Sequence, residues 1–351
     1  MSNRYTTREA VASAGSIKGT DHASEIDAAI DAASREIDRL TNRRFIPLTA
    51  TRYYNWPHSA GRSPYILLLD EDLLDATALT KDGTDVTAIE TTDFFEEPHN
   101  LKPYQWIEID LASSAYFSIK DTHQQQIRVT GSWGYCDDTV AAGTVASGLA
   151  DAEEGDTVLV FVCSNASLIG VGDTLLIGTE QVFVSERTVV DVGKNTNGAL
   201  TANKAQTTVT LEAAHAVLAG EVILVNAERM YVESVSVNDL SVVRAYDGTT
   251  LAAHDTASDV YTFRTLTIER GVNGTTAAVH ANATAINVYK PPADIQKFCK
   301  ALALADLQLS KGGWTGSIGG GEGVRETRTT VLSRMTDEIR KRYRRNIVVG
   351  V

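Results

Sequence analysis

The feature that most constrains the fold is a pair of internal repeats between residues 139 and 290. The segment Gly172–Val184 matches Gly220–Val232 at an offset of 48 residues, with glycine, acidic, leucine, glutamate, aromatic and valine positions recurring in order. The segment Arg244–His254 matches Arg270–His280 at an offset of 26 residues. A repeat made of a strand pair and a turn cannot bury its apolar face alone. The sequence therefore predicts one β domain over 139–290, a small barrel or sandwich built from two related halves.

Helical and strand patterns precede this β region. A helix is expected over about 21–42, because its apolar residues recur at intervals of four and three and form one stripe. This stripe is a packing surface, either for the core of the chain or for a neighbouring subunit. The subunit-packing interpretation rests on four side chains: Ile26, Ile30, Ala33 and Ile37. Between 45 and 135 the pattern changes to short β-rich runs separated by turn signals.

Two further helices are expected after the β region. One begins after Pro291-Pro292, because proline suits the first helical position, and the other spans about 327–345. All these helices have apolar faces that need partners. Residues 1–138 and 291–351 are therefore predicted to form one domain, with the β domain of 139–290 inserted at a loop. The predicted fold class is α+β, with a discontinuous helical-bundle core, short strands and an inserted all-β domain.

Composition and charge exclude several classes of protein. The 351 residues carry a formal net charge of −13 at pH 7, so most of the surface is unsuited to nucleic acid. No run approaches the roughly 18 apolar residues of a membrane span, and the first residues lack the apolar region of a secretory signal. Three cysteines, far apart and odd in number, predict reduced thiols. We therefore expect no membrane partner, no metal and no cofactor.

The C-terminal segment departs from this acidic character, because residues 325–345 carry a net charge of +5. A glycine-rich stretch over 311–323 is expected to act as a flexible linker before it. The basic segment is either a solvated helix end favoured by the helix dipole or a docking segment for an acidic protein or nucleic acid. Its apolar stripe favours a protein groove. The predicted partner-binding residues are Met335, Ile339, Arg340, Arg342, Tyr343, Arg344, Arg345, Ile347 and Val348.

No motif of nucleotide-binding, metalloprotease or hydrolase active sites is present. His254 and His280 occupy equivalent repeat positions, which leaves a metal-dependent hydrolase as an alternative. Matching positions in a repeat more often share one structural role, so we expect turns or hydrogen bonds there. The same applies to Glu180 and Glu228. The acidic run over 70–75 lacks the spacing of a calcium loop and is expected to be a solvated turn.

The order of several segments resembles a known family. These segments are Tyr5–Ala10, Ile37–Phe45, Thr51–Pro57, Ile127–Tyr135 and Pro292–Leu302, followed by the basic C-terminal helix. Their order is similar to that of the head–tail adaptor, or connector, proteins of tailed bacteriophages. The resemblance covers about 1–138 and 291–345. In that family the strand ending in a GxWG-like turn is soon followed by the next helix, whereas about 150 residues intervene here.

The resemblance implies a structural virion protein rather than an enzyme. Family members form a ring, commonly of twelve subunits, beneath the portal protein, where they extend the DNA channel and bind a tail-completion or stopper protein. The expected location is the head–tail interface of the virion, with assembly in the host cytoplasm. C-terminal segments engage the portal, and an acidic channel would let DNA pass without specific binding. Alternatives left open are another tail or baseplate protein, the hydrolase above, and a DNA-binding module using Arg340–Arg345.

Overall fold

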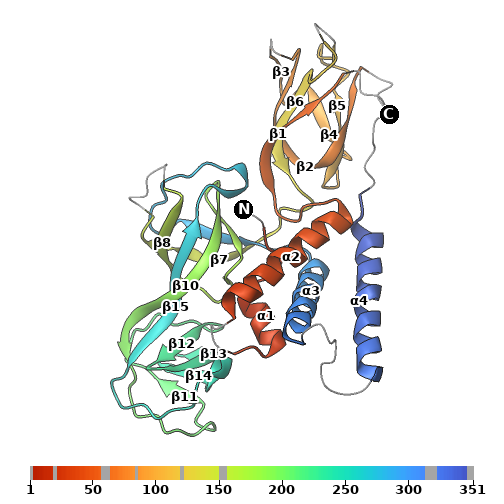
Figure 1. Cartoon of the computed structure of the whole chain (residues 1–351). Helices are drawn as coiled ribbons and strands as arrows, with labels where there is room; N and C mark the ends of the chain where they lie inside the picture. Colours follow the sequence, from red (N-terminus) through yellow and green to blue (C-terminus); the bar gives the residue numbers. More distant parts are fainter. Residues whose placement is uncertain are drawn as a thin grey trace.

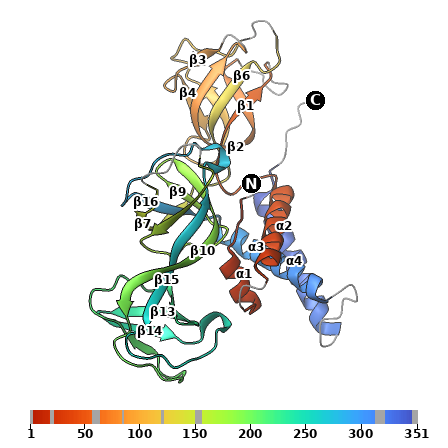
Figure 2. The ribbon, with the colours of Figure 1, turned by 60° about the vertical axis from the view of Figure 1, so that its left-hand side comes forward.

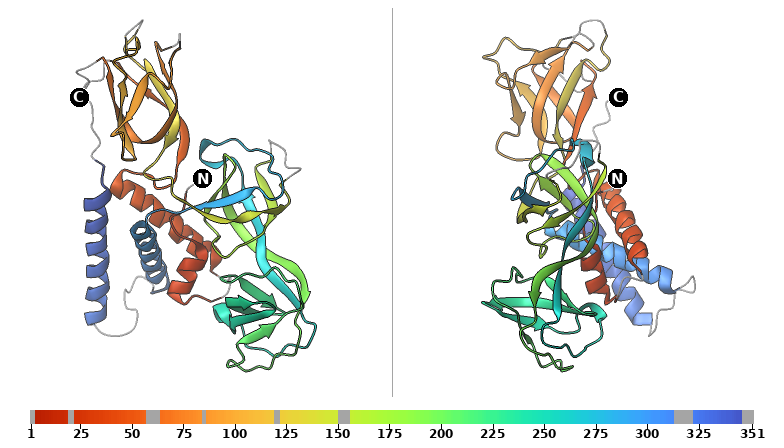
Figure 3. Two further views of the ribbon diagram at one scale, coloured as in Figure 1. Left: turned by 180° about the vertical axis from the view of Figure 1, so that it is seen from behind. Right: turned by 90° about the vertical axis from the view of Figure 1, so that its left-hand side faces the viewer.

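The computed structural model describes residues 3–18, 22–56, 64–83, 86–118, 122–149, 156–312 and 322–345. Four separate apolar cores lie in these residues: one among helices and three among strands. Figure 3 shows three β units following one another along the molecule, with the helices at the side of the middle one. We call these parts the helical hub, the N-terminal sheet, the first barrel and the second barrel.

The helical hub combines both ends of the chain (Figure 1). Its helices are α1 (Arg8–Gly15), α2 (Ala23–Thr41), α3 (Ala293–Gly312) and α4 (Glu322–Tyr343). The apolar stripe of α2 packs on α3, which buries Ile295, Phe298 and Ala303 on the facing side. Thr7 caps α1 by accepting a hydrogen bond from the Ala10 amide at 3.2 Å. No helix in the described ranges is long and apolar enough to cross a membrane.

The N-terminal sheet follows α2 and holds a core of its own. Its strands are β1 (Leu48–Tyr54), β2 (Ile66–Lys81), β3 (Thr87–Ile89), β4 (Phe94–Glu97), β5 (Tyr104–Ile109) and β6 (Ile127–Trp133). They pair antiparallel in the order β1-β6-β2-β5-β4, with β3 on the end of β2. Leu67, Ile107 and Val129 are fully buried between them. The sheet therefore covers its own apolar face without help from the helices.

This self-contained sheet corrects the predicted fold class. The chain is 40% strand and 21% helix, so a helical-bundle core with accessory strands is wrong. The prediction assumed that the short strands between 45 and 135 would complete a bundle. They instead pair with one another around Trp133 and its neighbours, because antiparallel strands can bury one face on a common core. The four helices form one core of their own beside the three β units.

The remaining strands form one continuous sheet of ten. They are β7 (Thr139–Ser147), β8 (Val158–Cys163), β9 (Thr174–Ile177), β10 (Glu180–Asn195), β11 (Thr208–Thr210), β12 (Val222–Val225), β13 (Glu228–Ser236), β14 (Asp239–Val243), β15 (Asp259–Glu269) and β16 (Ala285–Tyr289). Two short 3-10 turns, η1 (Tyr246–Gly248) and η2 (Val272–Gly274), follow β14 and β15. The first and last of these strands in the chain, β7 and β16, pair with each other, with Tyr289 opposite Thr139, and Tyr289 also belongs to the hub core.

This sheet closes into two barrels that share β10 and β15 (Figure 2). The first barrel runs β10-β9-β16-β7-β8-β15 and closes by the pairing of β15 with β10. The second runs β15-β12-β13-β14-β11, and a bridge between Leu211 and Thr196 returns it to the end of β10. Each barrel has its own core. The long strands β10 and β15 thus belong to the first barrel at one end and to the second at the other.

The two barrels are structural copies of each other. In the first, the Gly172 amide donates to the Val184 carbonyl at 2.9 Å, and in the second Gly220 donates to Val232 at 2.8 Å. Strands β9 and β10 correspond to β12 and β13, while η2 corresponds to η1. The second barrel is nested within the first, because its residues lie between the two halves of that barrel. The two sequence repeats have different offsets for this reason.

Candidate functional site

Each barrel contains a buried network of glutamate, arginine and histidine. In the second barrel Arg244 donates two hydrogen bonds of 2.8 Å to Glu228, and His254 Nε2 lies 2.8 Å from the same carboxylate. The backbone amides of Ala245 and Ala252 also donate to Glu228. The network ties the strand β13 to the turn after β14. Its members are fully covered from solvent.

The first barrel repeats this arrangement. Arg270 donates to Glu180 at 3.0 and 2.8 Å, and His280 Nε2 lies 2.8 Å from that carboxylate. His254 and His280 thus each bind a separate glutamate in a separate barrel. In the described residues no three side chains of histidine, cysteine, aspartate or glutamate are placed to hold a metal ion. The geometry assigns these four residues to structural networks.

The carboxylate of Glu228 is held in its charged form. Burial alone would raise its pKa, but the hydrogen bonds from Arg244, His254 and two backbone amides outweigh burial and lower the pKa from 4.5 to about 2. The pKa of Glu180 is lowered for the same reasons, with Arg270 as the main donor. These networks are therefore buried ion pairs whose acid is deprotonated.

We expect acid to destabilise the second barrel through Glu228. A pKa lower in the folded chain contributes stability above pH 4.5, and this stability is lost as the pH falls towards 2. Amide hydrogen exchange of β12–β14 at pH values across this window measures the effect. The variant Glu228→Gln should flatten the dependence, because it has no proton to gain. Identical pH profiles for the two proteins would contradict the assignment.

The predicted subunit-packing residues lie inside the chain. Ile26, Ile30, Ala33 and Ile37 are at most 5% exposed and belong to the hub core. A contact between subunits cannot use these side chains while the hub is folded. The face of α2 that packs on α3 is therefore occupied within one chain, and only its other face is free to meet a neighbour.

The predicted partner-binding residues of the C-terminal segment that the structure describes divide into three groups. Met335, Ile339 and Tyr343 pack against the hub, so their apolar stripe is already covered. Arg342 and Arg345 bind acidic groups of the same chain. Arg340 and Arg344 are exposed. Ile347, Val348 and most of the glycine-rich stretch 311–323 lie outside the described residues.

The end of α4 is fastened to the hub and to the N-terminal sheet. Arg342 Nη1 lies 2.7 Å from Asp294 on α3, and the Tyr343 hydroxyl donates to the same carboxylate at 2.8 Å. Arg345 forms an ion pair with Asp72, which also accepts from Arg43 at 2.6 Å. Asp72 is 5% exposed, at an irregular point in β2. The expectation of a solvated acidic turn is wrong for this residue, because two arginines cover it.

Four aromatic rings from distant segments meet beside this junction. Phe45 contacts Tyr5 at 5.5 Å, Tyr135 at 5.4 Å and Tyr343 at 5.3 Å between ring centroids. Tyr135 and Tyr343 also meet edge to face at 5.2 Å. Edge-to-face pairs are favourable beyond the area they bury. We call these four residues the aromatic cluster.

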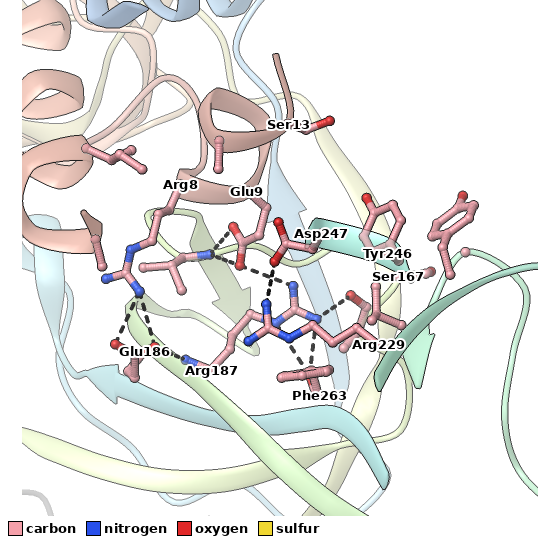
Figure 4. Close-up of a pocket in the computed structure, with 18 residues that line it drawn as sticks. Arg8, Glu9, Ser13, Ser167, Glu186, Arg187, Arg229, Tyr246, Asp247 and Phe263 are labelled. Atoms are coloured by element: carbon pink, nitrogen blue, oxygen red, sulfur yellow. Dashed lines mark hydrogen bonds and ion pairs between the residues drawn. The ribbon is translucent and has the colours of Figure 1, made fainter. Parts of the chain in front are cut away.

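A cavity of about 290 Å³ lies between α1 and the second barrel (Figure 4). The α1 side contributes Arg8, Glu9 and Ser13. The second barrel contributes a larger set: Gly220, Val222, Arg229, Tyr231, Tyr246 and Asp247. Tyr231 and Tyr246 stack with ring centroids 5.4 Å apart. The cavity therefore has an aromatic wall on one side and charged groups on the others.

The charged groups of the cavity form three ion pairs. Arg8 lies 3.2 Å from Glu186, and Arg187 lies 3.4 Å from Glu9. The guanidinium of Arg229 pairs with Asp247 and lies over the Phe263 ring at 5.1 Å. These ion pairs connect α1 with the strand β10, so the cavity is part of the contact between the hub and the barrels.

Sequence reasoning missed Asp72 and the cavity residues. Asp72 sits in an acidic run that reads as solvated, and no sequence signal marks the one member that turns inward. For Tyr231 a signal exists, because the repeat aligns it with Phe183 and marks an aromatic position in both copies. The partners of Tyr231 come from α1 and η1, and only the folded chain brings these together.

Comparisons with known proteins add no relative. No protein-family model, curated protein or solved structure matches this chain.

Proposed function

We propose that this chain is a head–tail adaptor subunit, a structural protein that assembles as a ring between a phage portal and its tail. The observation that carries the proposal is the aromatic cluster. Tyr5, Phe45, Tyr135 and Tyr343 come from four of the segments that resemble the adaptor family. These segments lie far apart in the sequence and still pack on one another. The resemblance therefore follows a physical unit of the molecule.

The remaining resembling segments lie in the N-terminal sheet and in the hub beside it. The second half of strand β1 lies in the segment Thr51–Pro57. The whole strand pairs with β6, which lies in the segment Ile127–Tyr135. The segment Pro292–Leu302 forms the start of α3 and supplies Asp294, the acceptor for Tyr343. A hub built in this way holds α4 in a fixed direction. Both barrels then lie outside the resembling unit, as an addition to it.

The portal-binding surface is assigned to cations at the end of α4 that face solvent, of which Arg340 has only an exposed contact of 4.0 Å with Asp337. Arg340, Lys341 and Arg344 are exposed on the last turn of α4 and just after it. Arg342 and Arg345 are already paired with Asp294 and Asp72. Three neighbouring positive charges on an acidic molecule suit an acidic protein surface, and such charges steer association at low salt.

The test is a pull-down with the tagged full-length chain from cells that produce the source particles. Partners are identified by mass spectrometry, and the mass of the assembly gives its subunit number. We expect a portal protein and a tail-completion protein. Recovery of neither would overturn the proposal. If the captured partner is duplex DNA and its binding falls steeply as the salt concentration rises, the DNA-binding alternative is favoured.

A charge-reversal variant locates the surface within this test. Arg340→Glu, Lys341→Glu and Arg344→Glu together should abolish capture of the portal. The matched control reverses three charges elsewhere: Lys194→Glu, Lys204→Glu and Lys297→Glu. The control should assemble as the unmodified chain does. Equal loss in both variants would show an effect of net charge alone and would contradict the assignment to α4.

A further inference from the structure

The first barrel binds the N-terminal segment of its own chain, Asn3–Glu9. Asn3 Oδ1 accepts a hydrogen bond from Asn273 at 2.9 Å, and the Arg4 guanidinium lies over the Phe183 ring at 5.4 Å. The Arg8 amide donates to the Val171 carbonyl at 3.0 Å. Three contacts therefore hold this segment: a backbone hydrogen bond, a hydrogen bond from a polar turn residue, and a cation–π contact between an arginine and an aromatic ring.

The second barrel presents the equivalent surface at the cavity. The repeat offsets place Tyr231 where the first barrel has Phe183, and Asp247 where it has Asn273. Both residues line the cavity. Gly220, also on the cavity wall, corresponds to Gly172; Arg4 lies beside Gly172, and the small side chain of Ser167 lies beside Gly220. The cavity is thus the second barrel's copy of the surface that binds Asn3–Glu9.

The backbone of this copy is available for pairing. Val171 uses its amide for Glu9 and its carbonyl for Arg8. Its counterpart Ala219 is exposed, and among the described residues no hydrogen bond engages its amide or its carbonyl. An extended segment could pair with Ala219 as the N-terminal segment pairs with Val171.

The charges around the cavity favour a cationic side chain. The carboxylates lie further out than the guanidiniums: Glu9 and Glu186 are 45% and 49% exposed, whereas Arg8 and Arg187 are 17% and 15% exposed. In these two pairs solvent therefore meets the carboxylate first, whereas Arg229 and Asp247 are about equally exposed, at 26% and 28%. The stacked tyrosines add a π surface, which attracts a guanidinium. The volume of about 290 Å³ lies at the low end of ligand pockets, which span roughly 300–1,000 Å³, and suits one long side chain.

We propose that the second barrel binds an extended segment of another polypeptide chain through an arginine. The guanidinium lies against Tyr231 and Tyr246, and the backbone of the segment pairs with Ala219. The copy in the first barrel, with Arg4 on Phe183, shows the mode of binding. This inference rests on the duplicated barrels alone and stands apart from the proposed adaptor function.

The test uses the full chain and a fluorescent peptide with the sequence of residues Asn3–Glu9. In the full chain the first barrel is engaged by its own tethered segment, whose effective concentration is high. Added peptide therefore reports on the second barrel. We expect saturable binding by fluorescence anisotropy. Replacing the peptide arginine that corresponds to Arg4 with glutamine should lower the affinity of the peptide at least about fivefold, as expected for loss of a cation–π contact.

Two variants of the protein locate the binding. Tyr231→Ala removes one ring of the stacked tyrosine pair, and Ser13→Trp fills the cavity from an exposed position on α1. Each variant should lower the affinity for the peptide at least about fivefold. The control Tyr116→Ala, on the N-terminal sheet and 50% exposed, should leave binding unchanged. Absent binding, binding that survives both variants, or equal binding of the glutamine peptide would each overturn the proposal.

Discussion

Replacing Arg244 with methionine is expected to lower the free energy of unfolding of the second barrel by about 3–5 kcal/mol. Arg244 is fully buried and donates two hydrogen bonds of 2.8 Å to Glu228. Methionine fills much of the same volume but leaves the carboxylate buried without its cation. The loss is large because an uncompensated buried charge keeps its full desolvation cost. Urea unfolding combined with amide exchange of β12–β14 measures it.

The duplication supplies a matched comparison for this prediction. Arg270→Met should destabilise the first barrel by a similar amount, and the increase in amide exchange should then appear in β9 and β16. The control Arg39→Met removes an exposed pair with Glu36 on α2 and should have no measurable effect. Equal exchange in both barrels after Arg244→Met, or no change in either, would show that the networks do not stabilise their barrels separately.

Replacing Phe45 with alanine is expected to lower the free energy of unfolding of the helical hub by about 3–5 kcal/mol. Phe45 is 1% exposed and touches three other rings of the aromatic cluster. Its loss leaves a cavity between the ends of α2 and α4. We therefore expect α4 to separate from the hub, with faster amide exchange over 331–345 and a lower temperature of unfolding.

A second phenylalanine provides the control for this effect. Phe95 on β4 is 43% exposed, so Phe95→Ala should change stability by less than about 1 kcal/mol. If Phe45→Ala leaves the exchange of α4 unchanged, the aromatic cluster does not hold that helix. The same variant informs the proposed function, because an adaptor whose α4 is released should no longer capture the portal.

The helix positions show what local sequence can determine. The spacing of apolar residues predicted a helix over about 21–42, and α2 spans Ala23–Thr41. Periodicity reports which face of an element is buried, because it depends only on neighbours along the chain. It does not report what covers that face. The same stripe fits a subunit contact and an internal core, and the packing of α3 decides for the core.

The error in fold class has the same origin. Short strands over 45–135 were visible as β-rich runs, but their pairing is a long-range property. β1 pairs with β6, although about 75 residues separate Leu48–Tyr54 from Ile127–Trp133. Once paired, these strands bury one another and need no bundle. Which strands pair depends on which of their faces meet in the folded chain. No local pattern in the sequence specifies the partner of a strand.

By itself the sequence determined the duplication. Its glutamate, arginine and histidine positions recur along the chain, and in the folded protein each set forms an equivalent network in its own barrel. A repeat is visible because similar local structure requires similar residues. Only the tertiary structure decided that the copies are nested barrels sharing β10 and β15, that Asp72 is buried under two arginines, and that α1 faces Tyr231 across a cavity. These features join residues far apart in the chain, and their energies exist only once the chain has folded.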